Sequence, residues 1–177
     1  MNYFELYELP VAFNINEQQV KRKFYELSKK FHPDYFINES EEKQQEILDL
    51  STLNNKAYQV LSSFRKRIEY VLELNNLVAE GEKYQLPQDF LMEMMEVNEA
   101  LMELELDAGE TELKKVSAQV NTIEKELQGE FEALAAKFDA EPETQRPATL
   151  EKIKDIWYRQ KYLLRIRNSL NRFASPQ

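Results

Sequence analysis

Apolar residues recur at helical spacing along most of this chain, and this pattern constrains the fold more than any other feature. The first stripe has members at positions i, i+4, i+7 and i+11, which is one face of an α-helix. Its members are Val20, Phe24, Leu27 and Phe31. Similar stripes follow within residues 47–61, 90–104 and 113–138. With only three glycines in 177 residues, hairpins and glycine-rich phosphate loops have little support. We therefore predict an all-α fold.

Residues that start or stop helices divide the first part of the chain. Asn16 begins a capping-box pattern and is predicted to open the first long helix. Pro33 ends this helix, because proline disfavours α geometry at the residue before it. The next helix is predicted to open at Asn38 and to run to about Ser62. A shorter helix is expected to end at residues 75–76.

The second part of the chain is predicted to form three longer amphipathic helices. The first begins near Pro87, a residue suited to the first turn of a helix. Residues 107–109 separate it from the second helix, and a loop at 142–147 precedes the third, expected over 150–173. Short connections favour an antiparallel three-helix bundle. The expected segments are an N-terminal domain at 1–76, a linker at 77–87 and a helical bundle at 88–177.

Charge is distributed unevenly along the chain, whose net charge is −9. Residues 77–112 contain eleven acidic residues and one basic residue, whereas residues 150–177 contain seven basic residues and two acidic residues. The simplest interpretation is two helices of opposite charge in one bundle. Nucleic-acid binding favours a basic domain, and this chain is acidic overall, so we expect no nucleic-acid partner.

The residue types that the chain lacks exclude several kinds of site. Without cysteine there is no disulfide, no thiolate nucleophile and no cysteine-ligated zinc or iron–sulfur centre. His32 is the only histidine, so a multi-histidine metal site is also excluded. No apolar run approaches the roughly 18 residues of a membrane helix, and the N-terminus lacks a signal-peptide pattern. We expect a cytoplasmic protein without cofactor, metal or membrane partner, and not an enzyme.

A tripeptide after the first long helix carries the functional signal. His32-Pro33-Asp34 directly follows the apolar stripe, and the sequence Leu53-Asn-Asn-Lys-Ala-Tyr-Gln-Val-Leu lies in the next predicted helix. In this order and spacing the two motifs resemble the J-domain family over residues 1–76. The resemblance implies that the protein stimulates ATP hydrolysis by a chaperone of the HscA/DnaK type.

The predicted chaperone-binding surface combines the tripeptide with a basic helix face. Arg22 and Lys29 lie nearly opposite the apolar stripe on a helical wheel, and such a face steers an acidic partner. The alternative is a solvated face with no partner. Tyr35 departs from the family, in which lysine is common at this position. The predicted chaperone-binding residues are His32, Pro33, Asp34, Arg22, Lys29 and Lys30.

The second half narrows the resemblance. Three segments are similar to the HscB family of co-chaperones for iron–sulfur cluster assembly: Asn2-Tyr-Phe-Glu-Leu, Arg67-Ile-Glu-Tyr-Val-Leu and Phe90-Leu-Met-Glu-Met-Met-Glu-Val-Asn-Glu-Ala-Leu. The last segment also has more apolar surface than one bundle face needs. In that family this patch binds an IscU-type scaffold protein. The residues carried over as client-binding are Leu91, Met92, Met95, Glu96, Glu99 and Tyr158, with Trp157 as the other possible aromatic position.

Two interpretations of this patch stay open at the level of sequence. In the first, an apolar surface edged with carboxylates receives a protein, and methionine adapts to the partner's shape. In the second, Leu91 and Met95 widen the bundle core and the glutamates are solvated. The predicted function is that of a co-chaperone that stimulates an HscA/DnaK-type ATPase and delivers an IscU-type scaffold to it. The alternatives are a J-domain protein for another client and a non-catalytic helical adaptor.

Overall fold

The computed structural model describes residues 1–107 and 109–174, and within them the regular structure is entirely helical. The all-α prediction is therefore confirmed. The chain divides into two compact units, Met1–Val78 and Ala79–Gln177.

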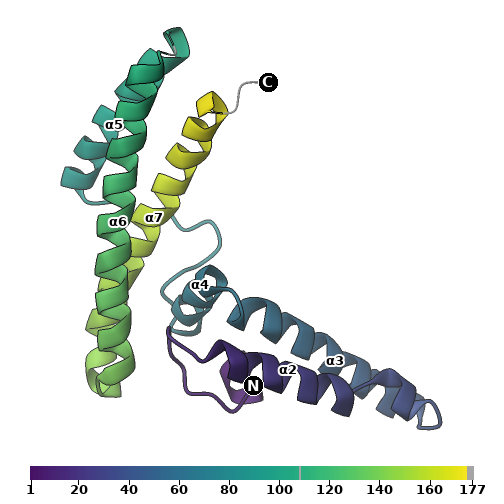
Figure 1. The fold of residues 1–177 in the computed structure, drawn as a ribbon. Coiled ribbons are helices and arrows are strands. Elements are labelled where there is room, and N and C mark those ends of the chain that lie inside the picture. The colour runs from purple at the N-terminus through teal and green to yellow at the C-terminus, as the bar shows by residue number, and fades with distance from the viewer. Residues whose placement is uncertain (108, 175–177) are drawn as a thin grey trace. The chain divides into compact units, whose positions relative to one another are not determined.

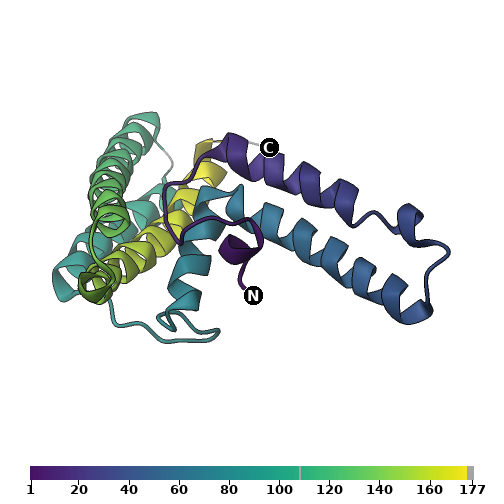
Figure 2. The same cartoon turned by 90° about the horizontal axis from the view of Figure 1, so that it is seen from below.

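The first unit contains an antiparallel pair of long helices with shorter helices packed around it. Its elements are α1 (Tyr3–Leu6), α2 (Glu17–Lys30), the 3₁₀ helix η1 (Pro33–Phe36), α3 (Glu41–Leu61) and α4 (Phe64–Leu74). α2 and α3 lie side by side in both views, and η1 lies in the connection between them (Figures 1 and 2). α1 and α4 both pack against α3, so α3 is the central element of this unit.

Apolar side chains from the four α-helices of the first unit meet in one core. Phe4, Tyr7 and Phe13 are fully buried near the N-terminus, and Val20 and Leu27 are the buried members of the α2 stripe. Phe24, which is half-buried, stacks on Tyr58 of α3 with ring centroids 4.3 Å apart. The buried residues of α3 and α4 complete the core: Ile47, Ala57, Leu61, Ile68, Val71 and Leu72.

The second unit is the predicted three-helix bundle, formed by α5 (Gln88–Leu106), α6 (Glu110–Ala140) and α7 (Arg146–Ala174), with a 3₁₀ turn η2 (Glu143–Gln145) before α7. α6 and α7 form the largest helix contact in the chain, and α5 packs against both. Figure 1 shows α5 running alongside α6. The predicted core stripe of α5 is buried throughout: Phe90, Met94, Val97, Leu101 and Leu104.

Two predicted helix starts are wrong, each for a local reason. α3 opens after Ser40 and not at Asn38, because the Ser40 hydroxyl caps the Lys43 N–H at 3.2 Å. α7 begins at Arg146, four residues before the expected Leu150. A proline in the first turn does not stop a helix, since its missing N–H would have no intrahelical partner there. The predicted cap at Asn16 is correct: its side chain accepts from the N–H groups of residues 18 and 19.

Candidate binding surfaces

The His-Pro-Asp turn is exposed at the end of α2. The helix ends at Lys30, and His32 has an extended backbone with φ −75° and ψ 124°. The His32 Nδ1 atom accepts a hydrogen bond from the Asp34 N–H at 3.2 Å and lies 3.7 Å from the Asp34 carboxylate. Because Nδ1 faces the turn, Nε2 is left to face a partner. The exposed fractions of the His32 and Asp34 side chains are 52% and 79%, so both are available for contact.

The predicted cationic face of α2 is also exposed, and its residues differ in their partners from the neighbouring Lys23. Arg22, Lys29 and Lys30 are all exposed, and the Lys30 ammonium lies 5.4 Å from the Phe31 ring centroid. Lys23, in contrast, forms an ion pair with Glu8, which holds the pKa of the Glu8 carboxyl below its usual value. Among the described residues Arg22 and Lys29 have no ion pair, so their charge is open to an acidic partner.

A buried polar network fixes the end of α2 against α3. Asn54, only 1% exposed, donates to the Phe24 carbonyl and to the Ser28 hydroxyl, both at 3.1 Å. The Tyr7 hydroxyl donates to Asn54 Oδ1 at 2.8 Å, and burial raises the pKa of this hydroxyl so that it stays a donor. The network holds the last turns of α2, and therefore the start of the His-Pro-Asp turn. Asn54 belongs to the motif Leu53-Asn-Asn-Lys-Ala-Tyr-Gln-Val-Leu, whose spacing does not predict this role.

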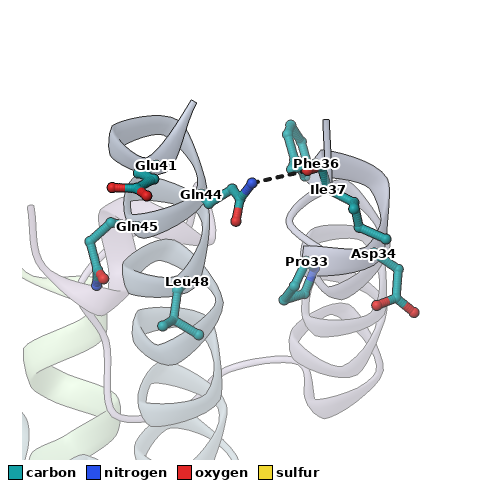
Figure 3. Close-up of a pocket in the computed structure, with 8 residues that line it drawn as sticks. All are labelled: Pro33, Asp34, Phe36, Ile37, Glu41, Gln44, Gln45 and Leu48. Carbon is teal, nitrogen blue, oxygen red and sulfur yellow. Dashed lines mark hydrogen bonds between the residues drawn. The ribbon is translucent and has the colours of Figure 1, made fainter. Parts of the chain in front are cut away.

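A pocket of about 400 Å³ lies directly beside Asp34, between η1 and the first turns of α3. The Gln44 amide donates to the Ile37 carbonyl at 3.0 Å (Figure 3). It also donates to the Glu39 carbonyl at 3.0 Å, and the two bonds tie the connection to α3. Two exposed apolar side chains, Ile37 and Leu48, contribute to its walls. The full lining is Pro33, Asp34, Phe36, Ile37, Glu41, Gln44, Gln45 and Leu48. Sequence analysis did not foresee this pocket.

The candidate client patch lies on the outer face of α5. The exposed fractions of the Met92 and Met95 side chains are 63% and 60%, whereas Met94 is fully buried. The interpretation that Met95 widens the core is therefore wrong, because Met94 occupies the core position. Leu91 is half-buried, between the core and the surface. Glu96 and Glu99 are exposed and edge the methionines with negative charge.

The aromatic residues of α7 have different surroundings. Trp157 is buried in the bundle. Tyr158 stacks on Tyr84 with ring centroids 4.4 Å apart, and its hydroxyl donates to Glu82 at 2.9 Å. Tyr162, one turn further along, accepts from the Asn98 side chain of α5 at 2.9 Å and packs edge-to-face on Phe90, with ring centroids 6.1 Å apart. Tyr162 thus brings an aromatic ring to α5. Sequence analysis missed it.

Part of the expected linker is attached to α7. The Lys154 ammonium donates to Glu82 at 2.9 Å, and this bond, together with the one from Tyr158, holds the pKa of Glu82 below its usual value. The Tyr84 hydroxyl donates to Asp155 at 2.7 Å; burial, and then this bond, raise its pKa. We name these contacts of residues 82–84 with α7 the linker clamp. The segment 77–87 is therefore not a uniform flexible tether.

No group of three or more histidine, aspartate, glutamate or cysteine side chains is arranged to hold a metal ion in residues 1–107 and 109–174. In the same ranges, no helix has the length and apolar character needed to cross a membrane.

Two family models match the chain, one in each unit. The DnaJ domain matches residues 2–70, and the HSCB C-terminal oligomerisation domain matches residues 86–171. Among curated relatives, the co-chaperone protein HscB of Buchnera aphidicola subsp. Acyrthosiphon pisum (strain Tuc7) is 35% identical over 167 residues, which cover 88% of this chain and 92% of the relative. The HscB homolog of Vibrio vulnificus (strain CMCP6) is 39% identical over 138 residues, covering 72% and 80%.

Solved structures show the same relationship. Human co-chaperone protein HscB superimposes with a TM-score of 0.72 at 25% identity, covering 100% of this chain and 84% of the human chain. The chaperone HscB from Vibrio cholerae superimposes with a TM-score of 0.58 at 27% identity, covering 96% and 99%. The exposed His-Pro-Asp turn, the two helical units and these matches lead to one conclusion: the chain belongs to the HscB-type family of J-domain co-chaperones.

Proposed function

We propose that this protein stimulates ATP hydrolysis by a chaperone of the HscA/DnaK type and delivers an IscU-type iron–sulfur scaffold protein to it in the cytoplasm. The observation that carries the proposal is that each of the two units has one exposed candidate binding surface. The His-Pro-Asp turn lies in the first unit, and the methionine patch of α5 lies in the second. The chain needs no cofactor of its own in this role.

The chaperone surface acts through a positioned turn and long-range charge. Arg22, Lys29 and Lys30 attract an acidic partner and raise the rate of encounter, an effect that is strongest at low ionic strength. His32, Pro33 and Asp34 then make the short-range contacts. The rigid support of Asn54 behind the turn lowers the conformational entropy lost on docking, because the turn is already held in place.

The client surface binds through apolar area with an acidic rim. Met92 and Met95 present flexible thioether side chains, which adapt to a partner's surface, next to the half-buried Leu91. Glu96 and Glu99 favour a partner with basic residues around an apolar centre. Tyr158 remains the aromatic residue predicted from sequence, and the contact of Tyr162 with α5 supports adding Tyr162 to this surface.

Joining the two surfaces in one chain accounts for delivery without chemistry by the co-chaperone. A client held on the second unit stays close to a chaperone held on the first unit. Its effective concentration there is therefore far higher than that of a free client. The two alternatives remain a J-domain co-chaperone for a different protein client and a helical adaptor with no chaperone partner. A binding assay with an IscU-type scaffold distinguishes the proposal from the first alternative, which predicts no binding. A chaperone ATPase assay distinguishes it from the second alternative, which predicts no stimulation.

The first experiment tests the turn. Steady-state ATP hydrolysis by the HscA/DnaK-type chaperone is measured against rising concentrations of the co-chaperone, with wild type and His32→Gln. We expect the substitution to abolish stimulation and to leave thermal unfolding and scaffold binding unchanged, because the imidazole is half exposed and outside the core. Full stimulation by a folded His32→Gln protein would contradict the chaperone assignment.

The second experiment tests the patch. Scaffold binding is measured by calorimetry for the double variant Met92→Ala with Met95→Ala, and for Met102→Ala as a matched control. Met102 is on the same helix and is 64% exposed, but it lies outside the predicted contact. We expect the double variant to weaken scaffold binding by about tenfold or more, since each lost side chain removes buried apolar area. Normal binding by the double variant would rule out the patch.

A further inference from the structure

Methionine is concentrated in one helix of this protein. The chain has five methionines, and four of them lie in α5: Met92, Met94, Met95 and Met102. Three of these four are more than half exposed, whereas Met94 has no exposed surface. The chain has no cysteine, and its single tryptophan, Trp157, is buried. The exposed methionines of α5 are therefore the groups of the second unit most open to a peroxide.

The relevant reaction is the two-electron oxidation of a thioether. A sulfur lone pair attacks one oxygen of hydrogen peroxide, the O–O bond breaks, and an S–O bond forms. The departing hydroxide takes the proton from the transferred oxygen, so the products are methionine sulfoxide and water. A methionine sulfoxide reductase reverses the change at the expense of a dithiol. The flexible apolar side chain becomes polar, which disfavours its burial in an interface.

We infer that Met92 and Met95 form an oxidation site at which hydroperoxides switch off client binding reversibly. This inference rests on the proposed client surface and adds a regulation to it. Met92 and Met95 are three residues apart, so they share one face of α5.

The neighbours of these two methionines make the sulfoxides costly to bury. Glu96 is four residues after Met92, and Glu99 is four residues after Met95, so each carboxylate is the helical neighbour of one sulfur. A sulfoxide oxygen needs a hydrogen-bond donor, and an ionised carboxylate has none to give. A sulfoxide covered by a client therefore loses its water without gaining a partner from this helix.

The experiment uses the full chain with hydrogen peroxide as the oxidant. Mass spectrometry follows sulfoxide formation at each methionine, and calorimetry measures binding of the IscU-type scaffold before oxidation, after oxidation and after treatment with sulfoxide reductases. We expect Met92, Met95 and Met102 to oxidise well before Met94. We expect scaffold affinity to fall by about tenfold or more and then to recover, since one unpaired buried polar group costs about that factor.

Two controls identify the residues responsible. The variant Met92→Leu with Met95→Leu keeps the apolar surface but cannot form sulfoxides there, so its affinity should be insensitive to peroxide. Met102→Leu should remain as sensitive as wild type. In addition, bound scaffold should slow oxidation of Met92 and Met95 but not of Met102, a test that requires no variant.

The outcomes separate this inference from the proposed function. If the reduced protein does not bind the scaffold, the proposed function is wrong. If the reduced protein binds and the protein oxidised at Met92 and Met95 binds equally well, only the oxidation switch is overturned. Oxidation of Met94 as fast as Met92 would also overturn it, because the switch depends on the difference in exposure. If the leucine variant binds the scaffold poorly when reduced, the protection measurement on wild type takes its place. Equal oxidation rates of Met92 and Met95 with and without bound scaffold would then overturn the inference.

Discussion

Replacement of Asn54 by alanine should destabilise the first unit strongly, although only one small polar side chain is lost. The Asn54 side chain takes part in three hydrogen bonds within the core, with Tyr7, Phe24 and Ser28. A hydrogen bond contributes about 0.5–1.5 kcal/mol, and a buried group left unpaired costs about 1–3 kcal/mol. The Tyr7 hydroxyl retains the Asn54 carbonyl at 3.2 Å as an acceptor, and Ser28 retains the Phe24 carbonyl at 2.7 Å.

These retained bonds limit the loss to about 2–4 kcal/mol of unfolding free energy. For a unit of this size, that loss lowers the melting temperature by about 10–25 °C. The assay is thermal and urea unfolding followed by circular dichroism, with Asn55→Ala as the matched control. Asn55 is the next residue of α3 and is exposed, so its replacement should change stability by less than about 0.5 kcal/mol.

Tryptophan fluorescence shows which unit the Asn54→Ala substitution destabilises. Trp157 is the only tryptophan of the sequence and is buried in the second unit, so its fluorescence follows the unfolding of the bundle. We expect Asn54→Ala to shift the dichroism transition and to leave the Trp157 fluorescence transition in place. Chaperone stimulation should fall at temperatures where the first unit is still folded, because the end of α2 loses its tie to α3. If Asn54→Ala and Asn55→Ala unfold alike, the network does not hold the turn.

Three further predictions concern other parts of the structure. The lowered pKa of Glu82 means that its carboxylate contributes stability above the usual glutamate pKa and loses it as pH falls through the lowered value. In the Glu82→Gln variant, the melting temperature of the second unit should therefore fall less as the pH is lowered. Glu80→Gln should leave this pH dependence unchanged. Leu48 lines the pocket next to Asp34, and we expect the chaperone to cover this pocket when it contacts the His-Pro-Asp turn. Leu48→Asn should therefore raise the concentration needed for half-maximal chaperone stimulation severalfold, whereas Leu164→Asn, an exposed change in the bundle, should have no effect. Phe131→Ala, at a fully buried position of α6, should cost about 3–5 kcal/mol in urea unfolding.

Local spacing accounts for the parts of the fold that sequence predicts well. The buried stripe of α5 was identified completely, because residues three and four apart share a helix face wherever the helix is placed. The cap at Asn16 and the exposed turn at 32–34 follow from equally local chemistry. The start of α3 was predicted two residues early because Asn38 and Ser40 are both good caps, and tertiary contacts of the connection decide between them.

Long-range placement accounts for the parts that sequence could not give. The Asn54 network joins residues 26 to 47 positions apart, and the linker clamp joins residues 71 to 76 apart. No periodic pattern encodes such pairs. The pocket beside Asp34 likewise arises only when η1 folds back on α3.

The aromatic residues of α7 show the division most clearly. Tyr158 and Tyr162 are four residues apart and therefore share a helix face, so sequence alone identifies the face but not which ring meets α5. Which of the two rings meets α5 depends on which part of α7 packs beside α5. In the folded bundle Tyr162 contacts Asn98, whereas Tyr158 stacks on Tyr84. The sequence by itself determined the helices, their buried faces and the exposed turn, since these depend on local geometry. Only the tertiary structure decided which side chains meet across helices, since that depends on the positions of whole elements.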